Sequence, residues 1–265
     1  MQYPEISRYT VVHKNLPKAF DGFKIVQLSD LHNKIFNKDN NLLTDMIDAL
    51  SPDIVVMTGD MFSHSMSGIP DLVGMVKTLS KRYGVYYVNG NHELSDTDAM
   101  TFGMIEAELK SAGAVNIDNK SVTIKREGKS LDIYGLCYSA EYYKGVREYK
   151  RNYKNVTVGV INDYIGKPRG NFTILLAHNP LDFDVQAEWG ATLSFGGHIH
   201  GGSIRVPVLG GVLSPERRLF PKYQSGMYSK KTNDGSMHYL IVSRGLGRFR
   251  INNKPDLVLC TCKAV

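Results

Sequence analysis

Cysteine is scarce in this sequence, which contains only three, at positions 137, 260 and 262. No two of them have the CxxC spacing of a zinc site, and the odd number leaves one thiol without a mate. We therefore expect no disulfide framework and a reducing compartment. Cys260 and Cys262 alternate with Thr261, a spacing that places both on one face of a strand, where small thiols are commonly buried.

Long apolar segments are also missing. No run approaches the roughly 18 consecutive residues that a membrane-spanning helix needs. Residues 1–9 lack the apolar centre of a signal peptide. These absences predict a chain that is cytoplasmic or peripheral to a membrane, although an anchor preceding residue 1 in a longer protein would leave no trace in this sequence.

The chain carries an excess of positive charge. Lysine and arginine number 32 against 26 aspartates and glutamates, which gives a net charge of +6 and a pI near 9.0. Such a surface attracts anions, including phosphates and acidic lipid headgroups. The basic residues are spread along the chain apart from short clusters at 144–154 and 244–250, so we expect no nucleic-acid partner.

Three apolar, β-branched segments in the first part of the chain are predicted strands. They are residues 24–29, 53–58 and 84–88. The residues between them carry apolar side chains at helical spacing, so a helix is expected to join each pair of strands. Asp30, Asp60 and Asn91 follow the strands at intervals of 30 and 31 residues, the length of a βαβ crossover. Three neighbouring parallel strands would therefore bring these side chains to one sheet edge.

Two later strands are predicted to carry histidines at their carboxyl ends. Residues 172–177 lead into His178, and residues 191–195 lead into a segment with the pattern GHxH. In that segment His198 and His200 alternate with an apolar residue, so both rings can face one cavity. A lone histidine such as His178 is more often a buried structural residue, whereas the GHxH grouping is specific.

The other predicted elements complete a sandwich of two sheets. They are a helix over residues 99–112, a hairpin over 121–125 and 131–136, and closing strands over 239–243 and 256–261. At 265 residues with 42% hydrophobic content, the chain can bury one large core. We predict an α/β fold built as a four-layer α/β/β/α sandwich, with a single domain over residues 1–265 and its core at about 24–259. The tyrosine-rich, basic residues 138–154 are either a loop or helix beside the site or ordinary surface, and surface is the default expectation.

Carboxylates at the ends of apolar strands need partners, because burying an unpaired carboxylate is costly. Asp30 and Asp60 are in this position. One alternative is that each Asp caps the next helix, but that explanation does not extend to the polar groups after the other strands. Asp, Asn and His together supply oxygen and nitrogen donors that suit Mn²⁺, Zn²⁺ or Fe. Two such ions can hold a phosphate and generate hydroxide at neutral pH, so the grouping indicates a phosphoesterase.

The motifs that carry these side chains resemble those of the calcineurin-like metallophosphoesterase superfamily, from residue 24 to about residue 259. They are Asp30-Leu31-His32, Gly59-Asp60, Gly90-Asn91-His92-Glu93, Ala177-His178-Asn179 and Gly197-His198-Ile199-His200. The resemblance implies two divalent metal ions, one bound by Asp30, His32 and His200 and the other by Asn91, His178 and His198, with Asp60 as the bridge. It also implies that a metal-bound hydroxide attacks the phosphorus of a phosphoester or diphosphate, and that His92 protonates the leaving oxygen.

The sequence departs from the superfamily pattern at two positions near the predicted ligands. Many members have an acidic or amide residue three positions after the bridging Asp, where this chain has Ser63, and many have Asp in place of Glu93. Glu93 keeps the negative charge on a longer side chain, whereas Ser63 removes a group that tunes the metal pair. His64 is expected to be a solvent-facing loop residue, and His13 and His238 are expected to be structural.

The segment over residues 201–247 is similar to a bacterial branch of the superfamily that is often membrane-associated and includes UDP-diacylglucosamine pyrophosphatases. Five of its basic, apolar and aromatic side chains suit an amphipathic phospholipid or an envelope phosphate, or are the ordinary surface of a loop that packs on the sandwich. They are Arg217, Arg218, Leu219, Phe220 and Tyr223. We expect an anionic phosphorylated substrate in either case.

Two functions other than hydrolysis stay open. One is a metal-bearing scaffold without catalysis, and the other is a peripheral membrane or cell-envelope binding protein. His92 favours the hydrolase over the scaffold, because a scaffold does not need an acid.

Overall fold

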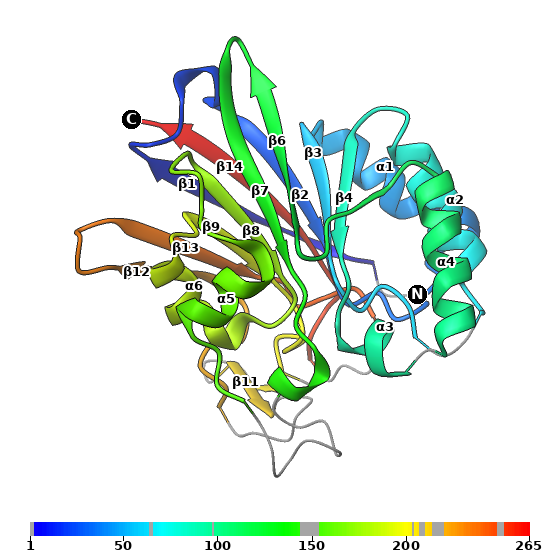
Figure 1. The fold of residues 1–265 in the computed structure, drawn as a ribbon. Coiled ribbons are helices and arrows are strands. Elements are labelled where there is room, and N and C mark those ends of the chain that lie inside the picture. The colour runs from blue at the N-terminus through cyan, green and yellow to red at the C-terminus, as the bar shows by residue number, and fades with distance from the viewer. Residues whose placement is uncertain are drawn as a thin grey trace.

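Two six-stranded sheets face each other in the computed structural model, with helices on their outer sides (Figure 1). The structure describes residues 3–63, 66–96, 98–143, 154–202, 204–206, 210–213, 220–247 and 252–265. The layers run from helices through two sheets to helices again, so the predicted four-layer α/β/β/α sandwich is confirmed.

The first sheet contains the three parallel strands that the sequence predicts as neighbours. Its strands, in spatial order, are β1 (Glu5–His13), β14 (Asp256–Ala264), β2 (Phe23–Leu28), β3 (Ile54–Thr58), β4 (Gly84–Val88) and β5 (Val115–Asn116). β2, β3 and β4 pair in parallel, with Ile25 opposite Ile54 and Ile54 opposite Gly84. β14 runs antiparallel to β2 and parallel to β1. The carboxyl ends of β2, β3 and β4 therefore lie at one edge of the sheet.

Helices cover the outer face of this sheet. They are α1 (Asn41–Leu50), α2 (Ile69–Leu79) and α4 (Ala99–Ser111), and the short α3 (Asn91–Asp96) begins three residues after β4 ends. Leu43 and Ile47 of α1 pack with Val55 and Met57 of β3 in one apolar cluster. Val55 and Met57 alternate along β3 with residues that face the second sheet. Both faces of β3 are therefore buried, and nearly all of its residues are apolar.

The second sheet contains the two strands that end in histidine motifs. In spatial order it consists of β12 (Gly226–Lys231), β13 (Met237–Val242), β9 (Leu193–Gly196), β8 (Thr173–Ala177), β7 (Lys129–Leu136) and β6 (Lys120–Arg126). β7, β8, β9 and β13 are parallel, and β6 and β7 form the predicted hairpin. A separate ribbon is formed by β10 (Ile204–Val206) and β11 (Gly210–Leu213).

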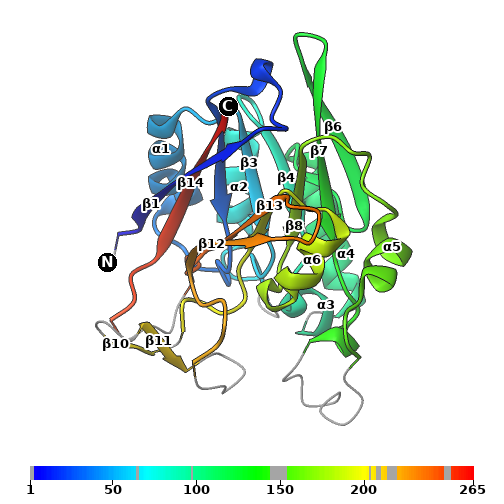
Figure 2. The ribbon, with the colours of Figure 1, turned by 90° about the vertical axis from the view of Figure 1, so that its left-hand side faces the viewer.

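Two helices lie against the outer face of the second sheet (Figure 2), α5 (Val158–Ile165) and α6 (Phe183–Trp189), and neither follows from the sequence pattern. β1, β5, β10, β11 and β12 were likewise not predicted. Short 3₁₀ turns occur at η1 (Lys18–Phe20), η2 (Lys38–Asn40), η3 (Ala140–Tyr142) and η5 (Pro180–Asp182). No helix in the described parts of the chain is both long and apolar enough to cross a membrane.

The space between the sheets is filled by apolar side chains from both. Ile25 and Val56 of the first sheet pack with Ile174 and Phe195 of the second. Cys260 and Cys262 belong to the same cluster, as their spacing predicts, and all three cysteines are buried free thiols. This core fixes the position of one sheet relative to the other, so that the polar segments following β2, β3, β8 and β9 meet.

The default expectation that the tyrosine-rich segment lies on the surface is wrong for its described tyrosines. Tyr138, Tyr142 and Tyr143 are buried, and they pack with Ile161 of α5. Apolar burial of a large aromatic ring outweighs the polar composition of its neighbours in sequence. Residues 144–153 lie outside the described part of the chain.

A matched pair of phenylalanines tests the importance of the core between the sheets. Phe195 is fully buried there, whereas Phe220 is 57% exposed. We expect Phe195→Ala to lower the free energy of unfolding by about 3–5 kcal/mol and Phe220→Ala to change it by less than about 0.5 kcal/mol. Urea titrations in EDTA measure both values, and similar losses for the two variants would contradict this assignment of the core.

Candidate metal centre

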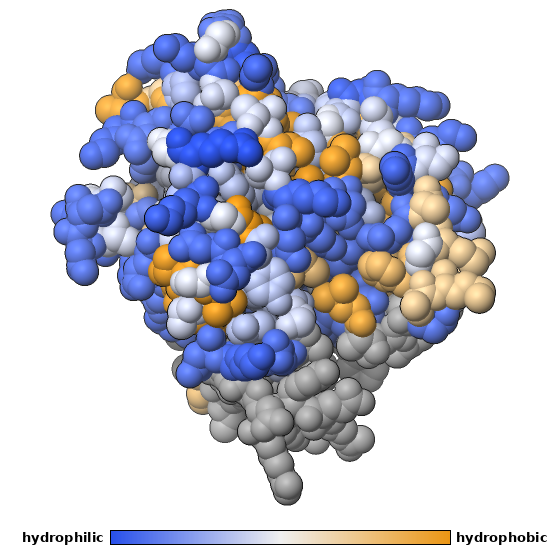
Figure 3. Space-filling view, in the orientation of Figure 1, coloured by the Kyte–Doolittle hydropathy of each residue, from blue (hydrophilic) through white to orange (hydrophobic). Residues whose placement is uncertain are grey.

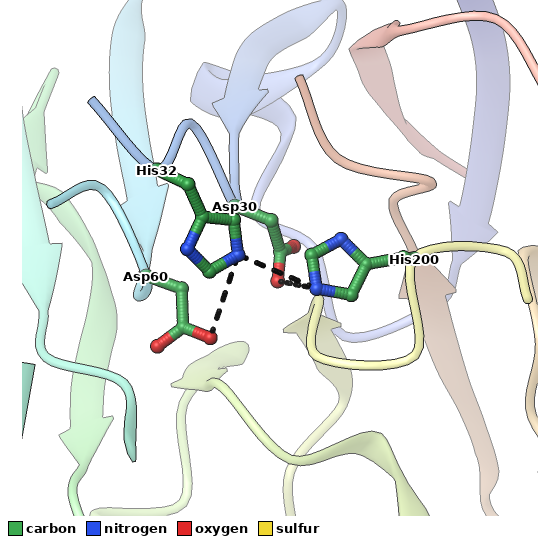
Figure 4. A group of neighbouring side chains, drawn as sticks. All are labelled: Asp30, His32, Asp60 and His200. Atoms are coloured by element: carbon green, nitrogen blue, oxygen red, sulfur yellow. Dashed lines mark hydrogen bonds and ion pairs between the residues drawn. The ribbon is translucent and has the colours of Figure 1, made fainter. Parts of the chain in front are cut away.

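The residues predicted to form a site all follow strands whose carboxyl ends point to the same region. Asp30 and His32 follow β2, Asp60 follows β3, Asn91 and His92 begin α3 after β4, His178 follows β8, and His198 and His200 follow β9. Two groups of donor atoms form there, each with its atoms within 4.8 Å of one another. The first contains Asp30, His32, Asp60 and His200 (Figure 4), and the second contains Asp60, His178 and His198.

Asp60 belongs to both groups, and its two carboxylate oxygens have different partners. Oδ1 accepts a hydrogen bond from the backbone N–H of His92 at 2.9 Å. Oδ2 faces the Nε2 atoms of three histidines, His178 at 3.0 Å, His32 at 3.9 Å and His92 at 4.0 Å. Burial opposes the ionisation of Asp60, but the charges of these histidines hold its pKa well below the usual range.

The first group fits a divalent cation. Asp30 Oδ1 accepts the backbone N–H of His198 at 3.0 Å and lies 3.6 Å from His200 Nε2. Asp30 Oδ2 is buried and has no hydrogen-bond partner among the described residues. The Nε2 atoms of His32 and His200 are only 3.4 Å apart, and their rings are stacked. A buried carboxylate oxygen beside two converging imidazole nitrogens is the donor set that a borderline metal ion binds.

The second group is fixed by a hydrogen bond behind His178. Its Nδ1 donates to the carbonyl oxygen of Thr58 at 2.7 Å, which turns Nε2 toward Asp60. Burial lowers the pKa of His178, but the Asp60 and Asp30 carboxylates outweigh burial and raise it to about 10. The His178 and His198 rings lie 5.1 Å apart between centroids. Tyr143 of the tyrosine-rich segment packs its ring 5.5 Å from that of His198, so this part of the segment lies beside the site, the alternative to a place on the surface.

Five of the site residues have left-handed backbone conformations. Their φ angles are 51° at Asp30, 48° at His32, 53° at Asp60, 65° at His198 and 55° at His200. Non-glycine residues in this region cost roughly 1–3 kcal/mol each, and such residues cluster at functional sites. The sharp turn at each position lets the side chain leave the strand and point into the shared space.

Two glycines leave room for the carboxylates. A Cβ atom on Gly90 would overlap Asp60 Oδ1, and one on Gly197 would overlap Ser29 Oγ and Asp30 Oδ2. Glycine is therefore required at these positions by close approach of the backbone to the ligands.

Glu93 organises the backbone around Asp60. Its Oε2 accepts the N–H groups of Asp60 at 2.9 Å and Gly90 at 2.8 Å, and its Oε1 accepts those of Met61 at 2.6 Å and Phe62 at 3.2 Å. Burial and the Asp60 carboxylate raise the pKa of Glu93 to about 8, whereas the hydrogen bonds oppose this shift because they favour the ionised form. None of these four contacts offers an acceptor to a protonated carboxyl group. The sequence motif includes Glu93 but does not indicate that it accepts these four backbone hydrogen bonds.

Residues distant in sequence hold the histidine loop after β9. Asn253 Nδ2 donates to the carbonyl oxygens of His200 at 2.6 Å and Gly202 at 3.0 Å. Gln27 Nε2 donates to the carbonyl of Gly196 at 2.9 Å. No motif signalled either amide, because each acts through backbone carbonyls that any residue provides.

The two histidines without a motif context have partners away from the donor groups. His13 is buried against Phe172, and His238 Nδ1 donates to the Ala191 carbonyl at 2.6 Å, in keeping with structural roles. Ser63 donates its backbone N–H to Asn33 Oδ1 at 2.7 Å. Tyr223 is buried and packs on Phe183 of α6. His64, Arg217, Arg218 and Leu219 lie outside the described residues.

The role of Glu93 predicts that its amide analogue cannot replace it. In Glu93→Gln the side-chain NH₂ would face two backbone N–H donors, so we expect the free energy of unfolding to fall by about 1.5–3 kcal/mol, the range for hydrogen bonds to charged groups. The exposed Glu108→Gln on α4 should change it by less than about 0.5 kcal/mol. Urea unfolding in EDTA at about pH 9, above the pKa of Glu93, measures both variants with the carboxylate ionised. Equal small effects would mean that Glu93 does not hold this loop.

The chain resembles known phosphoesterases along most of its length. The model of the calcineurin-like phosphoesterase family matches residues 23–202. The chain is 28% identical over 274 residues to the uncharacterised metallophosphoesterase YkuE of Bacillus subtilis, a match that covers 98% of this chain and 86% of YkuE.

Two other relatives have named activities. The chain is 24% identical over 305 residues to the UDP-2,3-diacylglucosamine pyrophosphatase LpxG of Chlamydia trachomatis, with 98% of this chain and 90% of LpxG covered. It is 26% identical over 273 residues to the phosphodiesterase YaeI of Escherichia coli, with 98% of this chain and 90% of YaeI covered. Since the family model matches more than half of the chain and includes the strands that carry the donor groups, the chain belongs to the calcineurin-like phosphoesterase family.

Proposed function

We propose that this protein is a dinuclear-metal-dependent phosphohydrolase that cleaves a phosphoester or diphosphate bond. The observation that carries the proposal is the pair of Asp/His groups that share the buried Asp60. The activities for which LpxG and YaeI are named, a pyrophosphatase and a phosphodiesterase, support hydrolysis at phosphorus without deciding between ester classes.

We assign seven residues to two divalent ions, and six of them belong to the two donor groups. Asp30, His32 and His200 would hold one ion, Asn91, His178 and His198 the other, and Asp60 would join both through its carboxylate. Mn²⁺, Zn²⁺ and Fe suit these oxygen and nitrogen donors. When bound, the ions supply a hydroxide nucleophile at neutral pH and neutralise charge on the phosphate oxygens.

The protein's own contribution is to orient these donors and to provide a proton. The Thr58 carbonyl fixes the tautomer of His178, and the Glu93 carboxylate fixes the loop that carries Asp60. His92 stands at the rim of this arrangement, with 38% of its side chain exposed and its Nε2 atom 4.0 Å from Asp60 Oδ2. It is therefore within reach of a bound phosphate, and we assign it as the acid that protonates the leaving oxygen.

The substrate is expected to be anionic, since the chain has a net charge of +6. An amphipathic phosphorylated lipid is compatible with that charge, as are smaller phosphoesters. The protein is expected to act in the cytoplasm or at the surface of a membrane.

Replacement of His92 tests the assignment of the acid. With Mn²⁺ the purified protein should hydrolyse bis-para-nitrophenyl phosphate or para-nitrophenyl phosphate. His92→Ala should lower kcat by about 10²–10⁴-fold, the range for loss of a general acid, while metal analysis still finds wild-type metal content. Loss of metal in parallel with activity would make His92 a ligand, and an inert, metal-loaded wild-type protein on a broad substrate panel would count against hydrolysis altogether.

Replacement of Asp60 tests the shared ligand. Asp60→Asn keeps the size of the side chain and removes the charge that would join two cations, so we expect loss of metal and a fall in activity beyond the roughly 10–100-fold typical of residues that only support ligands. Elemental analysis after dialysis measures the metal. Asp98→Asn, at the exposed start of α4, is the matched control and should keep both metal and activity. Full metal content in Asp60→Asn would refute the bridging role.

A further inference from the structure

Tyr143 is a buried aromatic residue in a polar part of the sequence. Hydrophilic side chains cover most of the face in Figure 3, and exposed apolar ones gather over α4, where Met100 is 78% exposed. Tyr143 is only 2% exposed, although residues 144–154 after it are rich in lysine and arginine. It directly follows η3, in the segment that leaves the carboxyl end of β7. Because β7 and β8 are parallel, this segment starts at the same sheet edge as His178.

The Tyr143 ring lies against both histidines of the second donor group. Its centroid is 5.5 Å from that of His198, with the ring planes at 65°, and 6.3 Å from that of His178, with the planes at 44°. The two imidazoles are themselves 5.1 Å apart at 71°. Each of the three rings therefore contacts the other two, at separations typical of favourable aromatic pairs. A change at Tyr143 would reach both imidazoles.

Such packing matters because the backbone alone does not fix the direction of an imidazole nitrogen. The χ2 torsion of histidine has broad minima, so contacts around the ring must limit its rotation. For His178, one such contact is the hydrogen bond from Nδ1 to the Thr58 carbonyl oxygen at 2.7 Å. The edge-to-face contact with Tyr143 limits rotation of the His198 ring in the same way, since a rotated imidazole would overlap the phenol ring.

The first donor group is held by other parts of the chain. The backbone N–H of Gly247 donates to the Asp30 carbonyl oxygen at 2.6 Å, and Asn253 Nδ2 donates to the His200 carbonyl oxygen at 2.6 Å. Both donors lie more than 100 positions after Tyr143 in the sequence. Loss of the Tyr143 ring should therefore affect the second donor group and leave the first in place.

We propose that Tyr143 is a positioning residue for the second metal ion, because its ring holds the imidazoles of His178 and His198 in the orientation that binds this ion. The inference rests on the proposed two-ion centre and adds a residue that none of the metal-ligand motifs contains. The ring carries this role, not the hydroxyl group. Phenylalanine should therefore replace Tyr143, whereas leucine is apolar but cannot make the edge-to-face contact.

Tyr134 provides a matched control. It is also 2% exposed and belongs to the same apolar cluster, but its ring packs on Trp189, which is in neither donor group. Tyr134→Leu and Tyr143→Leu should therefore lower the free energy of unfolding to a similar degree, as measured by urea titration in EDTA. Only Tyr143→Leu should alter metal binding.

Calorimetric titration of the metal-free full chain with Mn²⁺ measures the binding of each ion. The wild type, Tyr143→Phe and Tyr134→Leu should bind two ions with the same affinities. Tyr143→Leu should bind one ion about 10–100-fold more weakly, the range for residues that support metal ligands, and the other with wild-type affinity. Wild-type affinity for both ions in Tyr143→Leu, or equal weakening of both, would overturn the inference. Loss of an ion in Tyr143→Phe would also overturn it, because the hydroxyl group would then be a ligand.

Imidazole NMR spectra of the protein in EDTA separate this inference from the proposed function. The ring signals of His178 and His198 should shift or broaden in Tyr143→Leu, and they should keep their wild-type positions in Tyr143→Phe and Tyr134→Leu. Unchanged signals in Tyr143→Leu, for a protein whose wild type binds two ions, would refute the role of Tyr143 alone. A wild type that binds no metal, but whose signals respond in this way, would support the ring contact and refute only the metal centre.

Discussion

The arrangement of the candidate centre depends on one buried carboxylate, that of Asp60. It stands between two groups of imidazoles, of which His32 follows a strand of the first sheet and the others follow strands of the second, and its two oxygens have different partners. A charge in that position would be costly without partners. Its partners are the histidines, the His92 backbone amide and the proposed cations. These come from both sheets, so the sheets must pack in one relative position for the carboxylate to have its partners. The apolar core between the sheets fixes that position.

Bringing side chains to this point requires unfavourable backbone geometry at several of them. Asp30, His32, Asp60, His198 and His200 all adopt left-handed conformations. Hydrogen bonds from distant residues offset this cost: Glu93 holds the loop of Asp60, and Asn253 holds the loop of His200. The strain and its compensation occur together, which is the pattern expected where geometry is maintained for function rather than stability.

The short helix α3 lies between the candidate centre and a cavity. It begins with Asn91 and His92 at the candidate centre, and its Leu94 side chain lines the cavity between α4 and β5. The centre and the cavity therefore lie on either side of one element. Because α3 follows directly from the buried β4, this placement is set by the first sheet and not by a surface loop.

Much of the molecule was predictable from the sequence, since strands buried on both faces and helices with one apolar face leave strong periodic patterns. Asp30, Asp60 and Asn91 could be placed at one edge because parallel strands joined by helices have a fixed direction. Other features had no local signature. Tyr143 lies in a polar segment yet packs on His198, and Asn253 reaches His200 across 53 positions. The contacts of Glu93 with four backbone amides, and the cavity beside α3, likewise arise only when segments distant in the chain pack together. The sequence by itself determined the parallel half of the first sheet and the identity of the donor side chains, because these follow from periodicity and motif. The tertiary structure decided which helices cover the second sheet and which backbone groups and aromatic rings surround the donors, because such contacts depend on packing between elements.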